Sequence, residues 1–131
     1  MSAQRAPLSN GRWHFQHGPI DIVIGASGEA PALAAAHEAA WRRFETVLGE
    51  LVRELPMLRT PVAGPCLLQG VVARRMWHAC RPHQAEFITS MAAVAGSVAD
   101  ELMACYRRAG ITRAWVNNGG DIALHLTPGQ S

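Results

Sequence analysis

The sequence contains no lysine, and its twelve basic residues are all arginine. The protein therefore cannot form a Schiff base through a lysine or contain the lysine of a phosphate-binding P-loop. Charged residues make up only 17% of the chain and the net charge is +2. This charge gives no electrostatic case for a nucleic-acid partner. Because 49% of the residues are apolar, we expect a globular chain.

Cysteine is also scarce, and the three cysteines lie far apart at Cys66, Cys80 and Cys105. No C-x-x-C spacing occurs, so we expect free thiols in a reducing compartment and neither a disulfide framework nor a zinc site. The N-terminal segment lacks the apolar run of a signal peptide, and no apolar run reaches the length of a membrane span. We therefore expect a cytoplasmic protein with no membrane partner.

The length of 131 residues is typical of one domain. Residues 1–11 are expected to form a flexible arm, followed by a single domain over 12–131. Alternating apolar residues predict one hairpin near the start of that domain and one at its end, and the period changes to 3.6 between them. The predicted strands cover 12–16, 20–25 and the 112–126 hairpin, and the predicted helices cover 32–55, 70–80 and 90–108.

This order of two strands, then helices, then two strands predicts an α+β fold, in which a four-stranded antiparallel sheet is covered by helices on one face. Such a sheet has open edges, which favours pairing with another copy or another chain. Trp13, Phe15 and Trp115 near an edge would suit an interface.

One loop is richer in special residues than a plain hairpin requires. The stretch Val116-Asn117-Asn118-Gly119-Gly120-Asp121-Ile122 joins two apolar runs, and Asn-Gly is typical of a tight hairpin turn. Successive glycines also let backbone N–H groups approach a phosphate or a ring edge. Asp121 fits either a ligand site or a simple turn cap.

The helix before this loop carries a glycine at position 96, which costs about 1 kcal/mol relative to alanine. Ala92, Gly96 and Asp100 lie in one row along the helix. Two interpretations remain open: either a neighbouring element packs closely against Gly96, or Gly96 admits a ligand that Asp100 contacts. Ser97 and Glu101 are expected on the solvent side, without a role.

The segment Ala95-Gly96-Ser97-Val98-Ala99-Asp100, followed by Asn117-Asn118-Gly119-Gly120-Asp121-Ile122, resembles the ApbE-like superfamily. Its best-known members are flavin transferases, which split FAD and attach FMN to a Ser or Thr of a target protein with Mg²⁺. The likeness is nearest to an uncharacterised branch. Ala95 and Asn118 depart from the family pattern. The resemblance implies a fold in which a two-strand, two-helix, two-strand unit is duplicated along the chain. The family's second half has no counterpart, so the chain is interpreted as an N-terminal half of this duplicated architecture.

The resemblance implies binding of FAD or a related nucleotide, with transferase-like activity if another half or subunit completes the site. Mg²⁺ is expected only with that missing half, and no metal ligands or catalytic residues are assigned. The implied cofactor-binding residues are Gly96, Asp100, Asn117, Asn118, Gly119, Gly120 and Asp121. The alternatives are a non-catalytic structural or oligomerising module and a piece of a longer product.

Other polar residues are weaker candidates. His37 lies on the apolar stripe of the first helix and is expected to be a core histidine. His78 and His83 flank Cys80 without a second ligand pair, which argues against a metal site. Arg74 and Arg75 could clamp a phosphate, although such pairs more often form a solvated face. His125 on the last strand could line a pocket or a subunit contact.

Overall fold

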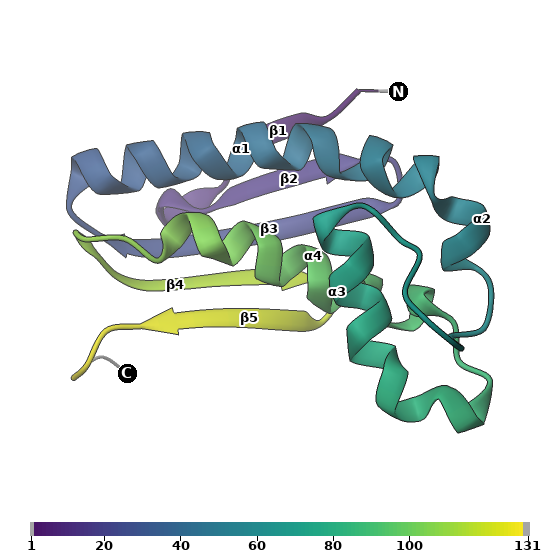
Figure 1. Ribbon diagram of the computed structural model, residues 1–131. Coiled ribbons are helices and arrows are strands. Elements are labelled where there is room, and N and C mark those ends of the chain that lie inside the picture. The colour runs from purple at the N-terminus through teal and green to yellow at the C-terminus, as the bar shows by residue number, and fades with distance from the viewer. Residues whose placement is uncertain (1, 130–131) are drawn as a thin grey trace.

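The computed structural model describes residues 2–129, within which five strands and four α-helices form one α+β layer structure (Figure 1). The strands are β1 Gln4–Pro7, β2 Trp13–His17, β3 Ile20–Gly28, β4 Ile111–Asn118 and β5 Asp121–Leu126. The helices are α1 Ala30–Arg53, α2 Leu55–Leu58, α3 Val71–Cys80 and α4 Val94–Met103. The predicted α+β class is confirmed.

All neighbouring strands are antiparallel, and the described sheet has the order β1-β2-β3-β4-β5. The prediction of four strands is wrong, because the expected arm supplies β1, which pairs with β2. The four residues of β1 are all exposed. A strand held mainly by backbone pairing carries no apolar alternation, so hydrophobic periodicity could not reveal it.

Both predicted hairpins are present. The first joins β2 to β3, and the second joins β4 to β5 through Gly119 and Gly120. These two glycines have φ of 60° and 100°, which is the conformation that a two-residue hairpin turn requires. The long connection between the hairpins, from α1 to α4, returns the chain to the same sheet.

Helices α1 and α4 cover one face of the sheet side by side (Figure 1). Helix α1 packs over β2 and β3, and α4 packs over β4 and β5. The buried face of α1 comprises Ala36, Ala40, Phe44, Val47 and Leu51. Phe15 on β2 is fully buried against Phe44 and Trp41, so its predicted role at an exposed edge is wrong.

The predicted helix over 90–108 is divided into three parts. A 3₁₀ turn covers Ser90–Ala93, α4 follows, and a second 3₁₀ turn covers Ala104–Tyr106. Helix α4 packs against α1 and α3 as well as against the sheet, so more of its surface is covered than a single apolar face. Ser97, expected toward solvent, is instead buried.

Candidate functional site

The glycine-rich turn lies at one end of the sheet and is held by asparagine. Asn117 Oδ1 accepts a hydrogen bond of 2.9 Å from the backbone N–H of Gly120. Asn117, not Asp121, therefore caps this turn. Asp121 is exposed and makes no side-chain hydrogen bond within residues 2–129, so its carboxylate is available to a ligand.

Asn118 connects the turn to helix α4. Its side chain is buried, and Nδ2 donates a 3.2 Å hydrogen bond to the carbonyl oxygen of Ala95. The structure thus brings the hairpin motif against the residue that precedes Gly96. Two segments that the sequence analysis singled out separately meet at this hydrogen bond.

A cavity of about 460 Å³ opens beside this contact, at the end of the layer where α1 finishes and α4 begins. We call it the end cavity. Its wall is mostly apolar and comprises Ile20, Leu48, Leu51, Val52, Met91 and Val94. The volume lies within the range of roughly 300–1,000 Å³ that small-molecule sites occupy.

Few polar groups face the end cavity. Asn118 and Ala95 form part of its lining next to the turn, and Arg59, which follows α2, lies on the lining as well. No hydrogen bond or ion pair within the described chain engages the Arg59 guanidinium. An apolar chamber with one amide and one free cation suits an organic anion that carries a ring.

Of the predicted cofactor-binding residues, only Asn118 lines the cavity. A Cβ added at Gly96, Gly119 or Gly120 would meet no heavy atom within 4 Å. Packing of a neighbouring element therefore does not explain Gly96, and the first of the two interpretations is wrong. Asp100 lies one turn further along α4 and is exposed.

Sequence reasoning missed a cluster of charges between the helices. Glu101 on α4 accepts hydrogen bonds from Arg43 Nε at 2.7 Å and Arg75 Nη2 at 3.0 Å. Arg43 also contacts Glu50 at 2.7 Å. Burial alone would raise the pKa of Glu101, but the hydrogen bonds and charges of both arginines outweigh it and lower the pKa. Glu101 thus joins α1, α3 and α4, contrary to its predicted solvent exposure.

The expectation for His37 is met by a hydrogen bond within the protein. Its Nδ1 lies 2.8 Å from the hydroxyl oxygen of Tyr106, and burial lowers the pKa of His37 and raises that of Tyr106. His125 Nε2 lies 3.4 Å from the carbonyl oxygen of Ile111. Both contacts attach side chains to neighbouring elements.

The arginine pair on α3 does not act as a clamp. Arg75 contacts Ser97 and Glu101, whereas Arg74 donates to the carbonyl oxygen of Leu68 at 3.3 Å. The structure forms no group of three His, Cys, Asp or Glu side chains suited to a metal between residues 2 and 129. No helix in that range is long and apolar enough to cross a membrane.

A family model described as AbpE bacteria matches residues 4–131. The chain belongs to this family. The match covers essentially the whole chain, so the interpretation as an N-terminal half of an ApbE-like protein is wrong. The matched range includes both hairpins and the helices between them. A search of curated proteins found no match.

Proposed function

We propose that this member of the AbpE bacteria family binds a nucleotide whose planar ring enters the end cavity, and that the nucleotide is a flavin. The observation that supports this proposal is the open, apolar cavity beside the hydrogen bond between Asn118 and Ala95. A flavin has three fused rings and a dimethylbenzene end, and therefore more apolar surface than a purine.

The cavity lining offers complementary partners for such a molecule. The aliphatic side chains of Leu48, Val52 and Val94 suit the faces of the ring system. The amide of Asn118 keeps its Oδ1 available as an acceptor for a ring N–H, because its Nδ2 is occupied by Ala95. Arg59 supplies a positive charge for a phosphate group.

The predicted turn residues form the rim in this proposal. Gly119 and Gly120 expose backbone with open space where side chains would be. Asp121 can accept a hydrogen bond from a ribityl or ribose hydroxyl. No transfer reaction is included in the proposal, because no residue is assigned to a catalytic step.

The test is a titration of riboflavin, FMN and FAD followed by flavin fluorescence. Val94→Trp places a large ring in the cavity and should weaken binding of all three by at least about tenfold. Val71→Trp is the matched control, because Val71 is 59% exposed on α3 and lies outside the cavity lining. Equal affinities of the two variants would contradict the proposal.

The arginine can be tested with the same ligands. Arg59→Gln should weaken the binding of FMN about tenfold. The binding of riboflavin, which has no phosphate, should be unchanged. Loss of both ligands to the same extent would show that Arg59 does not act on the phosphate.

An oligomerising module is the second candidate, and one observation favours it. Strand β5 is an edge strand in the described sheet, and its outward side chains Ile122, Leu124 and Leu126 are 60%, 59% and 43% exposed. Apolar side chains in a row on an open edge favour association.

Sedimentation equilibrium separates this candidate from a monomeric binding protein. Leu124→Glu should shift a dimer toward monomer, whereas Leu67→Glu, at a loop residue that is 62% exposed, should not. A wild-type protein that stays monomeric at all concentrations would exclude the oligomerising module.

A further inference from the structure

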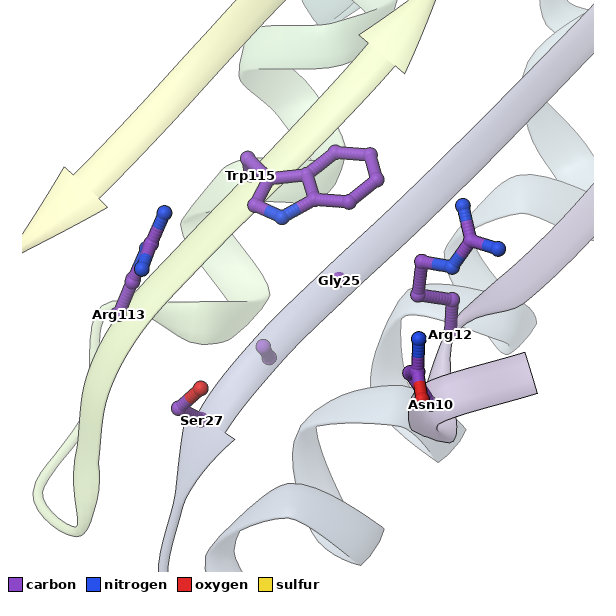
Figure 2. Close-up of a pocket in the computed structure, with 7 residues that line it drawn as sticks. Asn10, Arg12, Gly25, Ser27, Arg113 and Trp115 are labelled. Carbon is purple, nitrogen blue, oxygen red and sulfur yellow. The ribbon is translucent and has the colours of Figure 1, made fainter. Parts of the chain in front are cut away.

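A second pocket lies on the sheet face that α1 and α4 leave open. Its volume is about 230 Å³, and Figure 2 shows its lining residues around strand β3. We call it the sheet-face pocket, lined by Asn10, Arg12, Gly25, Ala26, Ser27, Arg113 and Trp115. None of these residues lines the end cavity.

The indole ring of Trp115 forms the platform of this pocket. Trp115 on β4 is paired with Gly25 on β3, and a Cβ added at Gly25 would lie 2.5 Å from Trp115 Cε2. The ring therefore lies directly against the β3 backbone, as Figure 2 shows. Glycine at position 25 is what permits this close approach. The ring packs against the backbone at Gly25, and Trp115 remains partly exposed.

Two arginines stand on opposite sides of β3 (Figure 2). Arg12 lies one step beyond the pair Trp13–Ile24 and is therefore opposite Gly25, while Arg113 is paired with Ser27. The Nε and Nη2 of Arg12 donate to Ser9 at 3.1 and 3.2 Å, which fixes its guanidinium.

The charge of this pocket is not compensated locally. No carboxylate lines it, and the Arg113 guanidinium has no hydrogen-bond or ion-pair partner in the part of the chain that the structure describes. Asn10, in a left-handed conformation with φ of 62°, and Ser27 add an amide and a hydroxyl. Two cations beside an aromatic platform recognise negative charge and a flat ring together.

We propose that the sheet-face pocket binds a small planar aromatic anion, a ring that carries a carboxylate or a phosphate. The ring stacks on Trp115, and the anionic group lies between Arg12 and Arg113. The two anionic groups share this chemistry, and the size of the pocket limits the ligand to a single ring or a fused pair. The sheet-face pocket shares no lining residue with the end cavity, so this proposal does not depend on flavin binding in the end cavity.

The experiment follows the indole N–H resonances of the uniformly ¹⁵N-labelled protein by NMR. The sequence has four tryptophans, and Trp115→Phe assigns the resonance of Trp115 by its disappearance. Phenyl phosphate, benzoate, inorganic phosphate and cyclohexanecarboxylate are added in separate titrations. At least one of the two aromatic anions should shift the Trp115 resonance and bind at least about fivefold more tightly than its non-aromatic counterpart. The tighter of the two identifies the anionic group.

Two arginine variants and a control complete the test. Arg12→Gln and Arg113→Gln should each weaken the binding of the more tightly bound aromatic anion by about tenfold. Arg107→Gln removes an exposed arginine outside the pocket and should leave the affinity unchanged. The dispersion of the remaining resonances reports whether each variant is folded.

Three results would overturn the proposal. The first is that neither aromatic anion shifts the Trp115 resonance at millimolar concentration. The second is that inorganic phosphate binds as tightly as phenyl phosphate and cyclohexanecarboxylate binds as tightly as benzoate. The third is an equal loss of affinity in Arg107→Gln and Arg113→Gln, which would assign the effect to overall charge.

Discussion

At the scale of single residues, glycine has different structural roles at different positions of this chain. A Cβ at Gly28 would lie 2.1 Å from the carbonyl oxygen of Gly110, whereas a Cβ at Gly96 meets only open space. From the sequence we singled out Gly96 and not Gly28, because a sequence does not distinguish a glycine required by packing from one that leaves an opening. The distinction needs the register of β3 against β4.

This difference predicts opposite effects of alanine on stability. Gly28→Ala should lower the free energy of unfolding by about 3 kcal/mol, because backbone must move to admit the methyl group. Gly96→Ala should raise it by about 0.5–1 kcal/mol, because alanine favours the helix and meets no neighbour. Urea denaturation of both variants measures these changes. A destabilised Gly96→Ala would show that some element does pack against that position.

The carboxylate of Asp121 gives a second residue-scale prediction. Asp121→Ala should weaken flavin binding by about tenfold without a change in stability, because Asn117 rather than Asp121 holds the turn. The affinity of Asp100→Ala for flavin is measured in the same way, because the sequence predicts that both aspartates belong to the site. If the affinity for FMN is the same in wild type and Asp121→Ala, Asp121 has no role in binding.

At the scale of elements, periodicity predicted both hairpins and helices α1 and α3, because each has a clear apolar pattern. It missed β1, whose residues are all exposed, and it placed Ser97 and Glu101 of α4 toward solvent, although Ser97 is buried and Glu101 is paired with two arginines. The contact between Asn118 and Ala95 joins residues 23 positions apart. The motif could be recognised in the sequence, but its cavity could not, because the apolar wall combines residues of β3, α1 and α4 that lie far apart in the chain.

The ion cluster that joins three helices predicts a pH dependence. Because the pKa of Glu101 in the folded protein is below its ordinary value of 4.5, the cluster stabilises the fold fully above that value. The contribution is lost as the pH falls through the lowered pKa, where the folded state also takes up the proton. Glu101→Gln should lower the free energy of unfolding by about 1–2 kcal/mol near neutral pH.

The measurement is urea denaturation of wild type and Glu101→Gln between about pH 7 and about pH 3. The two proteins should differ most at the higher pH and converge in acid. Glu45→Gln on α1 is the control, because Glu45 is exposed and makes no ion pair within the described residues. A difference that stays constant with pH would exclude an electrostatic role for Glu101.

At the scale of the whole molecule, the layer has two distinct surfaces. Helices α1 and α4 cover one face of the sheet (Figure 1). The end cavity lies at the margin of this helical layer, while the opposite face carries the sheet-face pocket and the exposed apolar side chains of β5. The family match over residues 4–131 covers both surfaces. A ligand in the end cavity would contact α1, α4 and the turn between β4 and β5 together.

Chemical-shift mapping with FMN on the ¹⁵N-labelled protein measures whether a flavin nucleotide occupies the end cavity. The proposed site in the end cavity predicts that the largest changes fall in the backbone of Val52, Val94 and Ala95 and in the side-chain amide of Asn118. Changes confined to Trp115 and its neighbours on the open sheet face, or no changes with FMN at millimolar concentration, would contradict it.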